Sequence, residues 1–220
     1  MEYIKSVFDI IFPTKDMCYF CKSNEIRIEN YICKSCMGKL DIVDKKVDLE
    51  SSSIEKCYYS TVYDKFMKDI IKRFKFDDHS YLYKPLASLI YGTVSRNRLA
   101  DEIDLIAFVP SHRRKEAVRG YNQSKLLAGW LSKELKIPIL DGLVKHKYTK
   151  SQHFLEGKNR KDNLKDAFKL KKGVNISGKK ILLVDDILTS GYTMSEVADC
   201  LVKNRAGTVV ALALTSGRKI

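Results

Sequence analysis

Residues 181–193 read Ile-Leu-Leu-Val-Asp-Asp-Ile-Leu-Thr-Ser-Gly-Tyr-Thr, and this stretch decides the expected fold. Its first four residues form a continuous apolar run, which is typical of a strand buried on both faces of a parallel sheet. Asp185 and Asp186 follow at the point where we expect this strand to end. The stretch therefore predicts an α/β fold with an acid pair at the carboxyl end of an inner strand.

A small hydroxyl-rich turn comes directly after the acid pair. The turn contains Thr189, Ser190, Gly191 and Thr193. Thr193 and Glu196 have the spacing of a capping box, so we expect a helix to begin here and to run over residues 194–204.

This order of residues suits a phosphorylated sugar. Ligands bind at the carboxyl ends of strands in open α/β sheets, and free backbone N–H groups at a helix start attract phosphate. Gly191 lets the backbone approach a ligand, and the two aspartates can accept hydrogen bonds from neighbouring hydroxyls, such as those of ribose. A solvated turn after a buried strand is the simpler interpretation of an isolated Asp-Asp pair. Here the coincidence of strand, acid pair, turn and helix start favours a ribose 5-phosphate site.

Composition and charge narrow the classes of protein. The chain has 220 residues, a formal net charge of +13 and a pI near 9.4, so one α/β domain with a small appendage is expected. The charge favours polyanionic partners such as nucleic acid or phosphorylated substrates, although a lysine-rich composition alone gives the same number. We find no apolar segment of membrane-spanning length and no signal-peptide pattern, and we therefore expect a cytoplasmic protein without membrane insertion.

Four cysteines near the start form the pattern C-x2-C-x11-C-x2-C. They are Cys18, Cys21, Cys33 and Cys36. Two x2 pairs match a tetrahedral zinc ion, whereas disulfides and an iron–sulfur cluster are the alternatives. Paired cysteines in the cytoplasm are more often metal ligands than disulfides, and four protein ligands leave no open position, so we expect structural zinc.

A basic segment follows a second candidate strand, residues 103–109. It contains Ser111, His112, Arg113 and Arg114. Arginine suits bidentate phosphate contacts, so a loop of this kind at a strand's carboxyl end can bind a diphosphate. On its own the segment is better interpreted as a basic surface turn, and the 181–193 stretch is what favours phosphate binding.

The rest of the chain gives weaker expectations. Residues 141–180 contain twelve Lys or Arg and four Asp or Glu, and 148–163 within them is typical of a mobile loop. The remaining expectations are an amphipathic helix at 1–12, a short hairpin at 22–32, a polar linker at 41–53, a helix within 58–76 whose lysines face solvent, and short strands at 137–140 and 143–147.

Taken together, the motifs resemble the ComF family, phosphoribosyltransferase-like proteins associated with natural transformation. Residues 181–193 resemble the 5-phosphoribosyl-1-diphosphate (PRPP) loop of type I phosphoribosyltransferases at every position. The other shared pieces are the four cysteines, the segment from Val109 to Gln123, and the set Thr149, Gln152, Leu155, Arg160 and Asn163.

The resemblance implies a type I phosphoribosyltransferase-like fold: an open, mostly parallel sheet with flanking helices, plus a small N-terminal zinc-binding module. The N-terminal helix, module and linker would occupy residues 1–50, and the phosphoribosyltransferase-like domain residues 51–220. Asp185 and Asp186 would hold the ribose hydroxyls of PRPP, which binds with magnesium. The 5′-phosphate would be held by Thr189, Ser190, Gly191, Tyr192 and Thr193. The diphosphate would lie by Ser111, His112, Arg113 and Arg114.

Three functions are compatible with these residues, and no catalytic residue can be named. The first is a PRPP-binding protein of DNA uptake, natural transformation or DNA processing, which the family and the net charge favour. The others are an active phosphoribosyltransferase that transfers ribose 5-phosphate to a base or amine, and a non-catalytic PRPP sensor. The partners implied are single-stranded DNA and a DNA-uptake helicase or other competence proteins, with Tyr121, Tyr148 and Phe154 as candidates for base stacking.

Overall fold

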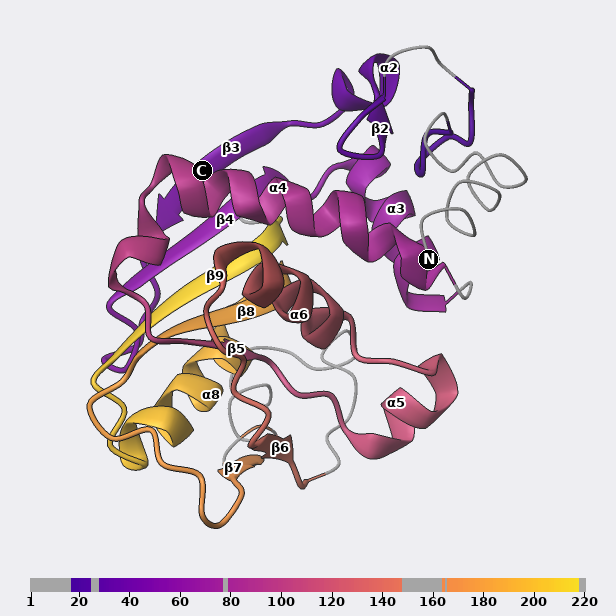
Figure 1. The fold of residues 1–220 in the computed structure, drawn as a ribbon. Helices are drawn as coiled ribbons and strands as arrows, with labels where there is room; N and C mark the ends of the chain where they lie inside the picture. Colours follow the sequence, from indigo (N-terminus) through magenta and orange to yellow (C-terminus); the bar gives the residue numbers. More distant parts are fainter. Residues whose placement is uncertain (1–16, 25–27, 77–78, 148–163, 165, 218–220) are drawn as a thin grey trace, which may run out of the picture.

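A five-stranded sheet forms the centre of the molecule in the computed structural model, which describes residues 17–24, 28–76, 79–147, 164 and 166–217 (Figure 1). The strand order is β3-β4-β9-β8-β5, and β3 alone is antiparallel to its neighbour. The strands are β3 Ile42–Val47, β4 Lys56–Val62, β9 Thr208–Ser216, β8 Lys180–Leu188 and β5 Leu105–Phe108. The predicted open, mostly parallel α/β sheet is confirmed.

Helices cover both faces of this sheet. On one face lie α3 Lys65–Phe76, α4 Tyr83–Arg96 and α6 Gln123–Leu135, and on the other lies α8 Tyr192–Lys203 (Figure 1). Alternate residues of β8 serve the two cores: Leu182 and Val184 pack toward α4 and α6, and Ile181 and Leu183 toward α8. An uninterrupted apolar run is what a strand with two buried faces requires.

Strand β8 is longer on one side than the sequence predicts. Its last pair with β5 is Phe108 with Val184, whereas pairing with β9 continues to Leu188. The expectation that the strand ends at the acid pair is therefore wrong for the β9 side. It holds for the β5 side, where the sheet opens immediately before the two aspartates.

The N-terminal module packs against helix α3. It consists of β1 Ile28–Glu29, β2 Ile32–Cys33 and α2 Lys34–Met37, and the antiparallel pair β1–β2 confirms the expected hairpin. The ring of Phe20 lies edge-on to that of Phe66, and the Arg73 guanidinium donates a 2.7 Å hydrogen bond to the Phe20 carbonyl. The module and α3 therefore share one apolar cluster.

Three expectations about secondary structure need correction. Residues 42–47 of the expected linker form β3 instead, and a polar segment can do this because an edge strand has one neighbour and remains partly exposed. The region 137–140 makes a single bridge, between Ile106 and Ile139. The 143–147 candidate is β6 Leu143–Lys145, which pairs with β7 Phe168–Leu170.

Other expectations stay open. The helix at 1–12, the loop at 148–163 and the residues Thr149, Gln152, Leu155, Arg160 and Asn163 lie outside the described residues. The division into 1–50 and 51–220 stays a prediction. The remaining elements are η1 Ser80–Leu82, η2 Leu99–Glu102 and α5 Arg113–Arg119. Among the helices described, none has the length and apolar character needed to cross a membrane.

Candidate ligand site beside strand β8

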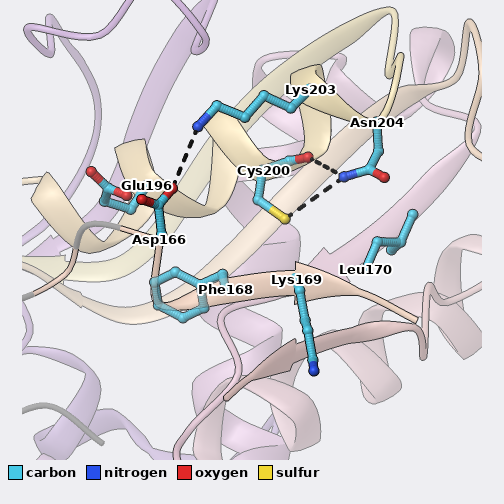
Figure 2. A pocket seen from close by; sticks show the side chains of 8 residues that line it. All are labelled: Asp166, Phe168, Lys169, Leu170, Glu196, Cys200, Lys203 and Asn204. Atoms are coloured by element: carbon cyan, nitrogen blue, oxygen red, sulfur yellow. Dashed lines mark hydrogen bonds and ion pairs between the residues drawn. The ribbon is translucent and has the colours of Figure 1, made fainter. Parts of the chain in front are cut away.

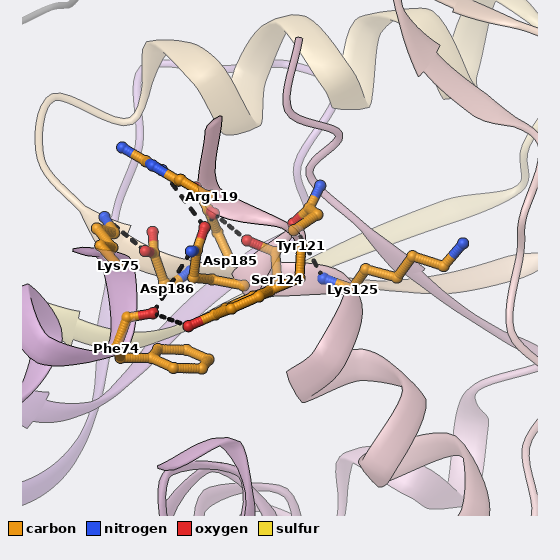
Figure 3. Close-up of polar contacts among 10 residues, drawn as sticks. Phe74, Lys75, Arg119, Tyr121, Ser124, Lys125, Asp185 and Asp186 are labelled. Carbon is orange, nitrogen blue, oxygen red and sulfur yellow. Dashed lines mark hydrogen bonds and ion pairs between the residues drawn. The ribbon is translucent and has the colours of Figure 1, made fainter. Parts of the chain in front are cut away.

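The acid pair is buried and held from two helices. Asp185 and Asp186 are 9% and 8% exposed. The Ser124 hydroxyl, at the start of α6, donates a 2.7 Å hydrogen bond to Asp185 Oδ1, and the Asp186 backbone N–H donates to the same oxygen. The Lys75 ammonium, at the end of α3, lies 2.5 Å from Asp186 Oδ2 (Figure 3). The two aspartates that we predicted to bind ribose thus lie together, in contact with the end of α3 and the start of α6.

Burial makes Asp185 reluctant to ionise. Desolvation, followed by the charge of Asp186, raises the pKa of Asp185 from 3.8 to about 7. The Ser124 hydroxyl, the Asp186 N–H and the Lys75 ammonium act in the opposite direction and only partly compensate. A strongly perturbed carboxyl next to a second carboxylate is a mark of a functional site.

Residues 121–123, at the start of α6, are uncharged and connect the elements around the acid pair through hydrogen bonds. The Tyr121 hydroxyl donates a 2.6 Å hydrogen bond to the Phe74 carbonyl (Figure 3). The Gln123 amide approaches the same carbonyl at 3.5 Å. Asn122 caps α6 by accepting from the Lys125 N–H, while its own amide donates to the Val109 carbonyl after β5. These bonds fix α3, β5 and α6 relative to one another.

The hydroxyl turn leads into α8 through Gly191. Gly191 caps the helix with φ = +85°, and no side chain caps it, so the predicted Thr193–Glu196 capping box is wrong. Glycine adopts this left-handed conformation without strain, and a Cβ here would also lie 2.7 Å from Leu49 Cδ2. Thr189, Ser190, Tyr192 and Thr193 surround this helix start, as the phosphate hypothesis requires.

The basic segment is a short helix, α5, where a loop was expected. His112 caps it by accepting a 3.2 Å bond from the Arg114 N–H through Nδ1, and the Ser111 hydroxyl donates to Glu116. Arg113 and Arg114 lie in its exposed first turn, and α5 buries no residue. Burial, and then the positive charge of Arg114 and Lys145, lowers the pKa of His112. The four predicted diphosphate residues thus lie together after β5.

Sequence reasoning missed the lysines that surround the acid pair. Burial, and then the charge of Arg119 and Lys75, lowers the pKa of Lys115; burial and then Lys115 lower that of Lys145 to about 8. The charge of Asp185 acts in the opposite direction on Lys145 and compensates only in part. A partly buried surplus of positive charge is suited to an anion.

The sequence held only a partial signal for these lysines. Lys75 ends a helix in which basic residues recur, and we interpreted them all as a solvated face. Lys145 reaches the site because β6 bridges to His112, a contact made by the fold. No spacing rule separates these two lysines from their exposed neighbours.

The four cysteines converge as predicted. Their sulfur atoms all lie within 4.8 Å of one another, and Cys21 alone is exposed. The Cys33 N–H points to Cys18 Sγ and the Cys36 N–H to Cys33 Sγ, each at 3.4 Å. Backbone donors stabilise thiolate charge, so this donor set fits one tetrahedral metal ion.

A hollow lies between β7 and α8, and none of the residues that line it was predicted to bind PRPP (Figure 2). The Lys203 ammonium lies 3.8 Å from Asp166 at one end, and the Asn204 amide donates to the Cys200 carbonyl at the other. Burial, and then the charge of Asp199, raises the pKa of Glu196, which lines the hollow. With both charge signs on its rim, this hollow matches no phosphate group.

The raised pKa of Asp185 has a consequence for stability. The folded chain binds more protons than the unfolded chain between pH 3.8 and about 7, so the free energy of unfolding decreases as pH rises through this window. Asp185→Asn, which mimics the protonated form, should therefore raise the melting temperature at pH 8, by roughly 2–4 °C for each kcal/mol gained.

The change should have little effect at pH 4, where the folded wild type is already protonated at this position. Asp141→Asn, at an exposed carboxylate paired with Lys125, is the matched control and should leave both melting temperatures within about 1 °C. Thermal unfolding by circular dichroism measures all three proteins. A lower melting temperature for Asp185→Asn at pH 8 would contradict the assignment of electrostatic cost to this carboxyl.

Comparisons with known proteins show what this chain is similar to. Residues 122–219 match the family model of the phosphoribosyl transferase domain, which includes the acid pair and the hydroxyl turn. Competence protein F of Haemophilus influenzae is 37% identical over 139 residues, 61% of this chain and 61% of the relative. The DNA utilization protein YhgH of Shigella flexneri is 34% identical over 147 residues, 65% of this chain and 64% of the relative.

A third relative aligns over most of the chain. Competence protein ComFC of Bacillus subtilis is 26% identical over 211 residues, 92% of this chain and 85% of the relative. The chain spans only 61% and 64% of the length of the first two relatives. This chain is therefore similar to proteins named competence protein F, YhgH and ComFC, and its residues 122–219 match the phosphoribosyl transferase domain.

Proposed function

We propose that this protein binds PRPP together with magnesium beside β8 and acts in DNA uptake, natural transformation or DNA processing. The observation that carries the ligand assignment is the buried acid pair, which lies between the start of α8 and lysines from α3, α5 and β6. PRPP offers two hydroxyls, a monophosphate and a diphosphate, and each matches one part of this arrangement. The process is proposed from the printed names of the relatives.

Each part of the ligand has candidate partners. Asp185 and Asp186 would accept hydrogen bonds from the ribose hydroxyls. The 5′-phosphate would lie at the start of α8, where backbone N–H groups and the helix dipole favour negative charge. The diphosphate would lie by Ser111, His112, Arg113 and Arg114, with Lys115 and Lys145 supplying further charge.

Magnesium fits the same arrangement because it prefers oxygen ligands from carboxylates and phosphates. When bound, it would neutralise part of the diphosphate charge. The chain's own contribution is to orient the ribose and to hold the leaving group among cations that are partly shielded from water.

An active phosphoribosyltransferase is the second candidate, and one observation favours it. Lys115 and Lys145 are partly buried and their positive charges repel one another, so they could stabilise diphosphate as it leaves. Release of diphosphate from PRPP in the presence of a panel of bases and amines separates transfer from binding alone. A PRPP sensor would bind the ligand and release no diphosphate.

The acid pair should dominate PRPP affinity. A hydrogen bond to a charged group contributes roughly 1.5–3 kcal/mol, so Asp185→Asn and Asp186→Asn should each weaken binding about tenfold or more. Gly191→Val should weaken it too, because a side chain is strained at φ = +85° and meets Leu49. Isothermal titration calorimetry with magnesium measures this, with Asp141→Asn as control. Unchanged affinity in the double Asn variant would remove the ribose role.

Structural zinc is proposed for the cysteine cluster. Elemental analysis should find about one zinc per chain, with Zn–S distances near 2.3 Å by X-ray absorption. Cys33→Ser should lose the metal, whereas Cys200→Ser, at a buried helical cysteine outside the cluster, should keep it. Two disulfides in metal-free protein would contradict this assignment. Reduced cysteines are also what we expect in the cytoplasm, the proposed compartment.

Single-stranded DNA is the proposed macromolecular partner, alongside a DNA-uptake helicase or other competence proteins. Exposed Arg113 and Arg114 are the part of the basic surface that the structure describes best. Replacing both with glutamate should weaken binding and reduce the slope of log K against log salt by roughly 1.4, because each phosphate contact contributes about 0.7. Fluorescence anisotropy across a salt series measures the slope.

Lys133→Glu, an exposed change in α6, serves as the charge control for this measurement. No binding of wild type at low salt would leave the charge as solvation alone. Of the stacking candidates, Tyr121 is engaged through its hydroxyl with the Phe74 carbonyl, and Tyr148 and Phe154 lie outside the described residues.

A further inference from the structure

We propose that Lys75 is an exchanging ligand residue: its ammonium neutralises Asp186 in the ligand-free protein and transfers to the diphosphate when PRPP binds. Lys75 would thereby select a ribose phosphate that carries a diphosphate over one that does not. The inference rests on the proposed binding of PRPP and adds a residue and a selectivity to it.

The first step is the competition at Asp186. The Lys75 ammonium lies 2.5 Å from Asp186 Oδ2, and the two side chains are only 18% and 12% exposed. The pairs Lys125–Asp141 and Lys203–Asp166 are far more open to water, and in the pair Arg96–Asp44 only the carboxylate is similarly buried. A hydroxyl that donates to this carboxylate must therefore displace or share a buried counter-ion, which costs much more than breaking a surface pair.

The second step is the fate of the displaced ammonium. Lys75 already contributes to the positive field that lowers the pKa of Lys115, and Lys115 in turn acts on Lys145. If Lys75 leaves Asp186, its ammonium adds to the positive charge of Lys115 and Lys145, which the charge of Asp185 offsets only in part at Lys145. That state is unfavourable unless the ligand brings its own negative charge.

A ligand with two hydroxyls and a diphosphate resolves both problems together. The hydroxyls replace Lys75 as donors to the acid pair, and the diphosphate takes up the freed ammonium. A ribose phosphate without the diphosphate must displace Lys75 and offers it no anion at that position. The cost of displacing Lys75 is thus compensated for PRPP and remains for ribose 5-phosphate, which favours the binding of PRPP.

The third step is that the side chain can move while the helix stays in place. The Phe74 ring is fully buried, and its carbonyl accepts hydrogen bonds from Tyr121 and Gln123. Arg73 on the preceding position is bonded to the N-terminal module. The backbone of α3 is therefore fixed up to Lys75, and its four-carbon stem supplies the reach for the exchange.

The test compares two ligands in Lys75→Met, which keeps the length of the apolar stem and removes the ammonium group. Affinities for PRPP and for ribose 5-phosphate are measured by isothermal titration calorimetry with magnesium. We expect PRPP to bind at least tenfold more weakly and ribose 5-phosphate to bind equally well or more tightly, because Asp186 is already free. The ratio of the two affinities should therefore fall at least tenfold.

Two further variants keep the test decisive. Lys72→Met, at an exposed lysine of the same helix, should leave both affinities within about twofold. Lys75→Arg keeps the charge and should restore most of the preference for PRPP, even where the methionine variant folds poorly. Equal losses for both ligands in Lys75→Met, or no loss for either, would overturn the exchange and leave Lys75 as a structural counter-ion. Wild-type protein that binds neither ligand would overturn the proposed function as well.

Discussion

The rest of this structure depends on two adjacent buried carboxylates, Asp185 and Asp186, which lie on β8 just beyond its last pair with β5. A buried charge needs donors or counter-ions, and the chain supplies them from elements far apart in sequence: Ser124 from α6 and Lys75 from α3. The pairing of β5 with β8 ends at Val184, and within the described part of the chain no other strand pairs with β8 on that side, which leaves room for these side chains. The interrupted strand pairing and the convergence of charge are thus parts of the same arrangement.

Helix α3 links the acid pair to the cysteine module. One end of the helix carries Phe66 against Phe20, and the other carries Lys75 against Asp186. Between them, the Arg73 guanidinium donates a hydrogen bond to the Phe20 carbonyl, and the Phe74 carbonyl accepts one from the Tyr121 hydroxyl. The module that fits a metal ion therefore shares a core with the helix that neutralises the ligand site, and packed cores transmit displacement because they contain few voids. A displacement of the cysteine module or of the acid pair would therefore act on the same helix, α3.

Sequence patterns predicted what depends on local order and missed what depends on tertiary pairing. The apolar run of β8, the cysteine spacing and the hydroxyl turn identified the fold and most candidate ligands, because each is a short-range pattern with one dominant structural use. The sequence predicts a linker where β3 lies, because an edge strand with Asp44, Lys45 and Lys46 has the composition of a solvated loop. Lys75 and Lys145 could not be separated from surface lysines, because burial by distant elements alone distinguishes them.

In the ligand-free site, both the negative charges of the acid pair and the positive charges of the nearby lysines are electrostatically unfavourable. Burial and the charge of Asp186 raise the pKa of Asp185, while burial and neighbouring positive charges lower the pKa of Lys115 and Lys145. The large apolar core on each face of the sheet offsets these costs, which is how a fold tolerates a strained functional site. A ligand that presents hydroxyls to the acids and phosphates to the lysines relieves both costs at once. Its binding free energy would then include the relief of repulsion inside the protein, and the folded state would gain stability with the logarithm of 1 + [L]/Kd.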